Sequence, residues 1–244
     1  MTFLMACLLL AQPANTLSDE ERREGWVLLF DGKSLKGWLT SPLAEPPEPA
    51  WAVENGTLRT TPGRGVRDYL VSEAKFRDFE FRFEWMVEAE ANSGVKYRAQ
   101  AWSMAGPGAQ DVQATWKGAA RFEPLACEYQ IADDEKNPDA IADAKHSTGA
   151  LYEYVAPRKS KAAGPGVWHS GRIVVRGLHF EHWLDGEKVT EGDFHSEEMR
   201  LSFQASKRRL SPKLLAAHEV LDSPVILQNH NGVVWFRNLK IRRL

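Results

Sequence analysis

The stretch Phe79-Glu-Phe-Arg-Phe-Glu-Trp-Met-Val87 alternates between large apolar side chains and mostly charged ones. A period of two residues is typical of a β-strand, because successive side chains of a strand point to opposite faces of the sheet. The apolar set comprises Phe79, Phe81, Phe83, Trp85 and Val87. Because only this set suits a core, the stretch predicts a strand whose sheet buries one face.

Further short runs with strand character lie on both sides of this stretch, and turn dipeptides separate many of them. Asp31-Gly32, Asn55-Gly56, Asp185-Gly186 and Asn231-Gly232 are dipeptides of the kind that closes tight hairpins. Residues 211–221 form the single convincing helix. About a dozen short strands with so little helix predict an all-β fold, a jelly-roll β-sandwich of two antiparallel sheets. No linker or repeat interrupts residues 25–244, which we assign to one domain.

The composition is that of a folded protein without a strongly charged surface. Hydrophobic residues make up 43% of the 244 residues, which is enough for a core. Lys and Arg number 31 against 33 Asp and Glu, which excludes a polybasic surface for nucleic acid or membrane. Nine Trp residues fit a β-sandwich core and equally fit stacking on sugar rings, so their number leaves both uses open.

The beginning of the chain carries an apolar run, Phe3–Ala11, that is too short to span a bilayer. Residues 1–14 therefore predict a cleaved secretory signal, and with it export to the periplasm or the cell exterior. Leu4-Met5-Ala6-Cys7 also resembles a lipoprotein box, which is the alternative. After cleavage Cys127 is the only cysteine left, so we expect a small buried hydrophobe rather than a disulfide.

Three predicted strands place polar side chains on a common face. In Cys127-Glu-Tyr-Gln-Ile131 the alternation puts Glu128 and Gln130 together. In Asn92–Arg98 it puts Lys96 and Arg98 together, as an ion-pair partner of Glu128 or as an anion-stabilising pair. Each strand can equally be a solvent-facing strand, so position along the strand does not by itself indicate a site.

The third such strand lies near the end of the chain. Ile226–His230 and Val233–Ile241 meet at Asn231-Gly232, which predicts a tight hairpin. Alternation in the first strand brings the amide of Gln228 and the imidazole of His230 side by side. The pair predicts either one wall of a sugar-binding cleft or a solvent-exposed strand on the surface.

The remaining polar candidates have weaker patterns. His146 and Tyr152 flank the entry to a short strand, and His182 sits among apolar neighbours, as a core histidine would. No HxH, HExxH or CxxC spacing supports a metal site. Asp133-Asp134-Glu135 fits a solvated acidic turn better than a calcium loop.

Taken in order, these pieces resemble a bacterial family of concanavalin A-like jelly rolls, the DUF1080 or 3-keto-disaccharide hydrolase domain. The resemblance begins with Gly25-Trp-Val-Leu-Leu-Phe-Asp-Gly-Lys-Ser-Leu-Lys-Gly-Trp38 and Trp51-Ala-Val-Glu-Asn-Gly56. It continues through residues 79–85, 92–98, 128–131, 148–152, 172–177 and 182–186 to Phe236-Arg-Asn238. Asp185 stands where Asn is usual, and Asn229-His230-Asn231 replaces the commoner Asp-His-Gly.

The resemblance implies cleavage of glycosides whose sugar is already oxidised to a ketone at C3. On this basis Glu128 is expected to act as base or metal ligand, while Arg98 and His230 stabilise an enediolate or orient the sugar. Gln130, Gln228, Tyr152 and Lys96 are expected to bind substrate, with His182 and His146 as weaker candidates. A divalent ion at Glu128 and His230 is compatible with this chemistry as a Lewis acid.

Two other functions are compatible with the same residues. A retaining glucanase needs two carboxylates about 5 Å apart, and Gln130 stands where the second is expected on that face. A non-catalytic sugar-binding module needs only aromatic and hydrogen-bonding side chains. The sequence leaves open the leaving group, the choice between elimination and direct hydrolysis, and the oligomeric state.

Overall fold

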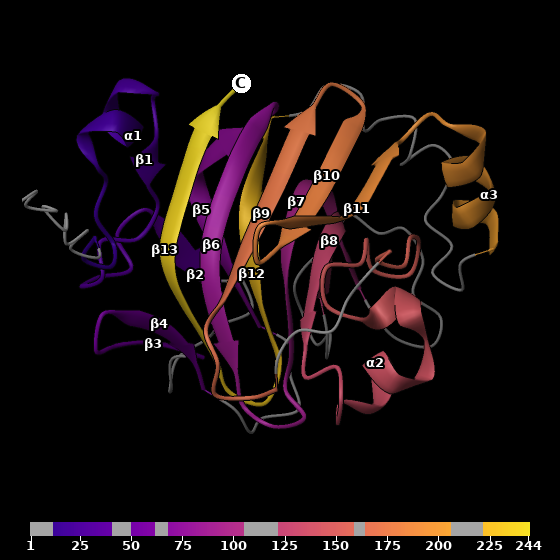
Figure 1. The fold of residues 1–244 in the computed structure, drawn as a ribbon, viewed down its shortest axis with the longest axis horizontal. Helices are drawn as coiled ribbons and strands as arrows, with labels where there is room; N and C mark the ends of the chain where they lie inside the picture. Colours follow the sequence, from indigo (N-terminus) through magenta and orange to yellow (C-terminus); the bar gives the residue numbers. More distant parts are fainter. Residues whose placement is uncertain (1–11, 41–49, 62–67, 105–121, 159–163, 206–221) are drawn as a thin grey trace, which may run out of the picture.

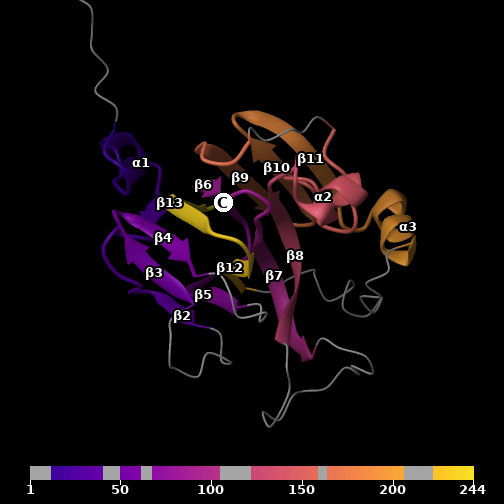
Figure 2. The ribbon, with the colours of Figure 1, turned by 90° about the horizontal axis from the view of Figure 1, so that it is seen from below.

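Two antiparallel sheets pack face to face in the computed structural model of the chain (Figure 1). The structure describes residues 12–40, 50–61, 68–104, 122–158, 164–205 and 222–244. Seen from below, the larger sheet and the smaller sheet form two layers (Figure 2). This sandwich confirms the predicted all-β class.

The larger sheet has eight strands. In spatial order they are β11 (Glu187–Asp193), β10 (His179–Leu184), β9 (His169–Arg176), β6 (Phe79–Val87), β13 (Val234–Arg243), β4 (Thr57–Thr60) and β3 (Trp51–Glu54), with β1 (Val27–Leu28) paired to β13. The smaller sheet has five: β2 (Trp38–Thr40), β5 (Asp68–Phe76), β12 (Ser223–Asn231), β7 (Asn92–Met104) and β8 (Phe122–Ala132).

The core between the sheets is rich in aromatic rings. All five apolar residues of the stretch 79–87 are at most 1% exposed, which confirms the face predicted from their alternation. Phe83 meets Tyr129 of the opposite sheet edge to face, with ring centroids 5.3 Å apart. Such contacts hold the two sheets at a fixed spacing and so fix where the outer faces lie.

The predicted hairpin at Asn231-Gly232 is wrong. The strands on either side, β12 and β13, lie in different sheets and share no register. Gly232 adopts φ +70°, and a Cβ there would come within 2.7 Å of Ala91 Cβ. The dipeptide therefore makes a turn that crosses from one layer to the other and leaves no room for a side chain.

Three short α-helices that the sequence analysis did not predict accompany the sheets: α1 (Asp19–Arg23), α2 (Pro138–Ala142) and α3 (Glu197–Ala205), with a 3-10 turn at Ala144–His146. A capping box between Ser18 and Glu21 starts α1, and Asn137 caps α2. The predicted helix 211–221 lies outside the described residues, as do residues 1–11 of the predicted signal. Among the described residues no helix is long and apolar enough to cross a membrane.

Candidate active site

One face of the smaller sheet gathers four of the predicted site residues, Glu128, Lys96, Gln130 and Gln228. The strand register aligns Gln130, Gly94, Gln228 and Tyr69 in one row and Glu128, Lys96, Ile226 and Val71 in the next. The opposite face of the same strands carries core residues such as Tyr129. We call the outward side the polar face, defined by Glu128, Lys96, Gln130, Gln228 and Tyr69.

Glu128 and Lys96 form an ion pair at the centre of the polar face. Lys96 Nζ donates to Glu128 Oε2, and the whole residues are only 2% and 4% exposed. Two charges withdrawn from water in this way cost several kcal/mol each unless they satisfy one another. The pair is thus a strong local dipole between uncharged residues of the neighbouring strands, with Gly94, Gln130 and Gln228 in the adjacent row.

Two amides flank this pair, and one of them has an unsatisfied oxygen. Gln130 Nε2 donates to Asn92 Oδ1 at 3.3 Å, which fixes the orientation of Gln130. Gln228 is 2% exposed, and its Oε1 accepts no hydrogen bond from any described residue. A buried acceptor without a donor costs about 1–3 kcal/mol, so Gln228 is suited to accept a hydrogen bond from a bound hydroxyl group.

His230 follows Gln228 on β12 at a break in the strand register. Asn229 pairs with Ser93, but Asn231 pairs with Asn92, so β12 carries one extra residue at His230. Such a bulge re-aims a side chain, and simple alternation no longer decides the face of His230. His230 is half-buried, and its role in the site stays a prediction.

Arg98 does not join the polar face, contrary to the sequence prediction. Its backbone has φ +52°, and the register between β7 and β8 shifts after Tyr97. The guanidinium donates to the carbonyl of Gly177 and lies 4.9 Å above the ring of Phe194. The backbone irregularity turns this side chain toward the other sheet, so Arg98 and Lys96 do not act as a pair.

His182 likewise does not lie on the polar face, because it is in the core with no exposed surface. Its Nδ1 donates to the carbonyl of Gly149 at 3.0 Å, and its Nε2 accepts from the Tyr97 hydroxyl at 2.9 Å. Both nitrogens are therefore used by the neutral ring. Burial lowers the pKa of His182 from 6.5 to about 4.

This buried ring predicts an acid-sensitive fold. Because the folded pKa is depressed, the unfolded chain binds the proton first, and stability falls as the pH drops from about 6.5 to about 4. The loss over that window is expected to reach about 3 kcal/mol. Urea unfolding at pH 7 and pH 4 measures it, and a His182→Gln variant should show a shallower pH dependence. An identical slope in both proteins would assign the effect to other groups.

His146 and Tyr152 lie together at the edge of the polar face. The segment around Tyr152 runs along β8, where the Tyr152 amide donates to the Glu128 carbonyl at 3.0 Å. The His146 and Tyr152 rings stack with centroids 4.5 Å apart. Asp139 joins them, accepting from the Tyr152 hydroxyl at 2.7 Å and facing His146 Nδ1 at 2.9 Å.

Asp139 is a further candidate, which the sequence patterns did not single out. The signal was present in Asn137-Pro138, a helix start that holds Asp139 in the first turn of α2. Glu153 stands on the other side of His146, with Oε1 3.5 Å from Nε2. An imidazole between two carboxylates, stacked on a phenol, is equipped to hold and pass on a proton.

Cys127, the only cysteine among the described residues, plays no visible part in this chemistry. Cys127 faces the core, and burial raises the pKa of its thiol to about 12. The thiol therefore stays protonated at neutral pH and is not a nucleophile.

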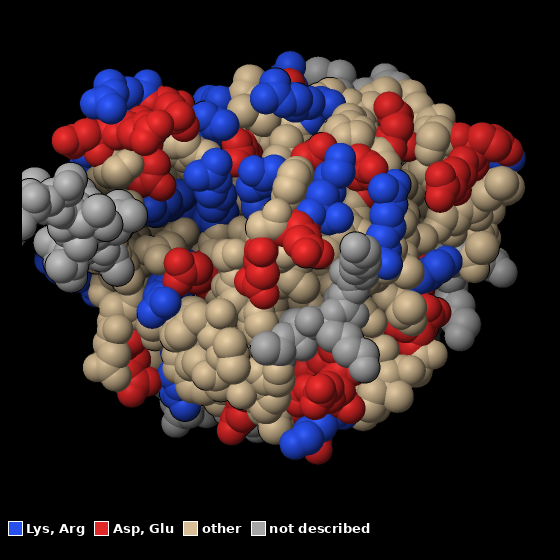
Figure 3. Space-filling view, in the orientation of Figure 1, with Lys and Arg blue, Asp and Glu red and all other residues tan. Residues whose placement is uncertain are grey.

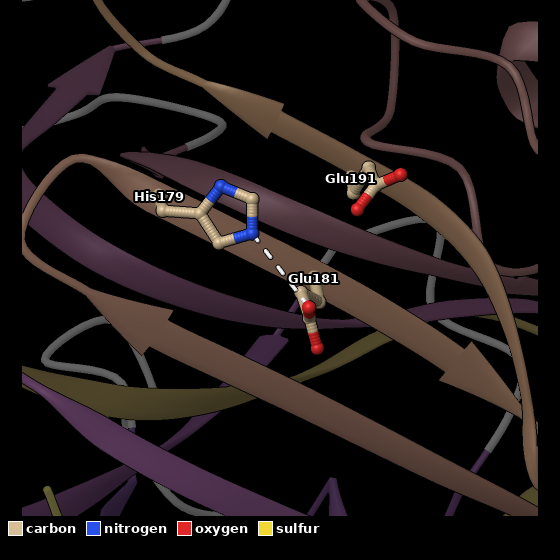
Figure 4. A group of neighbouring side chains, drawn as sticks. All are labelled: His179, Glu181 and Glu191. Carbon is tan, nitrogen blue, oxygen red and sulfur yellow. Dashed lines mark ion pairs between the residues drawn. The ribbon is translucent and has the colours of Figure 1, made fainter.

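Within the described residues, one group of side chains has the spacing of a metal site, and it lies on the other sheet. His179, Glu181 and Glu191 approach one another on β10 and β11 (Figure 4). Lys188 Nζ already binds both carboxylates, at 3.2 Å from Glu181 and in a shorter contact to Glu191. The group is better described as a surface ion-pair network. Glu128 has an ammonium partner of its own, so its predicted metal role stays a prediction.

Known proteins match this chain over most of its length. The sequence matches the family described as the 3-keto-alpha-glucoside-1,2-lyase-like domain over residues 25–242. A 3-keto-disaccharide hydrolase of Bacteroides thetaiotaomicron is 28% identical over 240 residues, covering 91% of this chain and 79% of that protein.

Solved structures agree with this match. A protein of Parabacteroides distasonis ATCC 8503, provisionally assigned as a glycosyl hydrolase, has a TM-score of 0.73 at 27% identity, covering 95% of this chain and all of that one. A second protein of that strain, with the same provisional assignment, shares the fold at a TM-score of 0.62 and 22% identity, covering 90% of this chain and 99% of the other. The chain therefore belongs to the 3-keto-alpha-glucoside-1,2-lyase-like domain family.

Proposed function

We propose that the protein cleaves glycosides that carry a ketone at C3 of the sugar, and that the polar face is its active site. The observation that carries this proposal is the buried Glu128–Lys96 pair, flanked by the amides of Gln130 and Gln228. The family to which the chain belongs supports the same chemistry.

The reaction needs a base, help at the ketone oxygen and a donor for the leaving oxygen. A C3 ketone acidifies the C2 proton, and removal of that proton leaves an enediolate. The C1 substituent is β to the carbonyl, so it departs with its bonding electrons and takes up a proton. Addition of water to the resulting enone completes a net hydrolysis.

The residues of the polar face match these requirements. Glu128 is the base, and the Lys96 ammonium beside it stabilises the negative charge that develops on the sugar oxygens. Gln130 and Gln228 bind hydroxyl groups, and the unsatisfied oxygen of Gln228 selects one of them. The Asp139–His146–Tyr152 cluster at the edge supplies the proton to the departing oxygen, and His230 orients the sugar.

The decisive experiment offers the protein a 3-keto-glucoside and, separately, the same glycoside without the ketone. Cleavage of the 3-keto compound alone supports the proposal. Cleavage of the unoxidised compound indicates a conventional glucanase, which Gln130 disfavours because an amide replaces the second carboxylate on that face. Binding of either compound without turnover indicates a sugar-binding module.

Gly94 provides a test of the position of Glu128 that removes no polar group from the protein. An ideal Cβ at position 94 would lie 2.9 Å from Glu128 Cγ, so the close approach of that side chain depends on glycine. A Gly94→Ala variant is expected to displace Glu128 and lower turnover on a 3-keto-glucoside at least about tenfold. Gly164→Ala is the matched control, because an added methyl there meets no atom within 4 Å. Equal turnover in the two variants would show that the position of Glu128 does not matter.

A further inference from the structure

A row of cations crosses the outer face of the larger sheet, on the side of the molecule opposite the polar face. The strand register aligns Lys240 with Arg82, Arg82 with Arg172, Arg172 with Trp183 and Trp183 with Lys188. We call these four cations the basic row. In the space-filling view, blue side chains form a band across this face (Figure 3).

Like charges at directly opposed strand positions repel each other and destabilise a sheet. Three of the four cations are compensated by carboxylates. Lys240 binds both oxygens of Glu21, Arg82 binds Glu80, and Lys188 binds Glu181 and Glu191. Arg172 is compensated less well, because its ion pair with Glu80 is long, at 3.6 Å, and carries no hydrogen bond.

Arg172 donates no hydrogen bond to any described residue. The carboxylate of Glu80 comes within 3.6 Å, but its two oxygens already accept bidentate hydrogen bonds from Arg82 and Arg242. The Nε atom of Arg172 is buried without a partner. Partial burial lowers the pKa of Arg172, and the nearby carboxylates of Glu80 and Glu181 offset only part of this effect.

The guanidinium of Arg172 is nevertheless held in place. Its Cζ atom lies over the indole of Trp183, 3.7 Å from the ring centroid. Stacking of this kind fixes the plane of the five donors and leaves their edge available for a planar anion. A pre-positioned guanidinium whose N–H groups make no hydrogen bond within the protein is suited to recognise a carboxylate.

A cavity of about 260 Å³ opens beside this side chain. Arg82, Arg172 and Lys240 line it together with Glu21, Glu84 and Trp183. Its volume lies just below that of pockets for drug-sized ligands, so it suits about one sugar ring. The two carboxylates in the lining already accept hydrogen bonds, Glu21 from Lys240 and Glu84 from Arg237 and Asn238. A carboxylate oxygen has a further lone pair that can accept from a hydroxyl group, which a sugar supplies and sulfate lacks.

We propose that this cavity is a second carbohydrate site, which binds a sugar carboxylate of the hexuronate class through the guanidinium of Arg172. The carboxylate of the sugar pairs with Arg172, and the ring hydroxyls face Glu21 and Glu84. This site lies on the other sheet from the polar face, so it binds ligand independently of the cleavage proposed above.

Titration calorimetry of the full chain with sodium glucuronate, glucose and sodium sulfate at low ionic strength tests the proposal. Glucuronate is expected to bind at least about tenfold more tightly than either of the others, as a charge-assisted bidentate pair requires. Arg172→Gln should weaken glucuronate binding at least about tenfold, and Arg172→Lys, which keeps the charge but loses the planar fork, should also weaken it.

The matched control is Arg176→Gln. Arg176 is an exposed arginine on the same face of β9 as Arg172, and it does not line the cavity, so its removal should leave glucuronate binding unchanged. Equal affinity for glucuronate and glucose would overturn the proposal. So would equal affinity for glucuronate and sulfate, or undiminished glucuronate binding by folded Arg172→Lys. Because binding rather than turnover is measured, failure here leaves the proposed cleavage activity untouched.

Discussion

A Glu128→Gln variant is expected to lose at least about a hundredfold of its turnover on a 3-keto-glucoside. The substitution preserves the size of the side chain but removes the carboxylate that takes the C2 proton. It also removes the anionic partner of Lys96. Steady-state rates of leaving-group release measure the effect. Both kcat and KM are determined, because loss of the base lowers kcat, whereas loss of a binding contact raises KM.

The control for this variant is Glu135→Gln, the same exchange at an exposed position in the turn after β8. It should retain normal rates. If Glu128→Gln also turned over at a near-normal rate, Glu128 would not be the base. The His146 cluster at the edge of the polar face would then be the next candidate.

A Lys96→Met variant is expected to lower the free energy of unfolding by about 3–5 kcal/mol. The methionine fills the space of the lysine stem, but Glu128 is left as a buried carboxylate without its cation. Urea denaturation measures the loss at pH 7. Adding Glu128→Gln should recover a large part of it, since the double variant contains neither charge.

Lys188→Met is the matched control for the stability measurement. Lys188 also bridges two carboxylates, but its side chain is 33% exposed. Ion pairs at such exposed positions contribute about 0–1 kcal/mol. If Lys96→Met were no more destabilising than Lys188→Met, the polar face would be better solvated than its burial indicates.

Regular alternation is what made the sequence informative about this fold. In Phe79–Val87 and in Cys127–Ile131, the period of two residues correctly identifies which side chains enter the core. The same rule brings Glu128 and Gln130 to one face. Neighbouring strands then add Lys96 and Gln228, because antiparallel register preserves the face from strand to strand.

The failures have a common physical cause, which is that local patterns do not specify tertiary partners. The side chain of Arg98 does not lie on the polar face, because the backbone is irregular at this residue, and no residue type in the sequence indicates that irregularity. His182 obeys the alternation, but only the structure supplies the Tyr97 hydroxyl and Gly149 carbonyl that satisfy it in the core. Asp139 joins His146 through a turn of helix rather than through a strand.

The crossing at Asn231-Gly232 has a consequence for how the protein folds. The two strands that it joins occupy interior positions in the two sheets, with β12 between β5 and β7 and β13 between β6 and β4. The centre of each sheet therefore depends on pairing between distant parts of the chain. Folding that depends on such contacts is slow, because the entropy of closing long loops is lost before the contacts form. The aromatic strands of the core are therefore expected to stay exposed for longer during folding than they would in a sheet built from local hairpins.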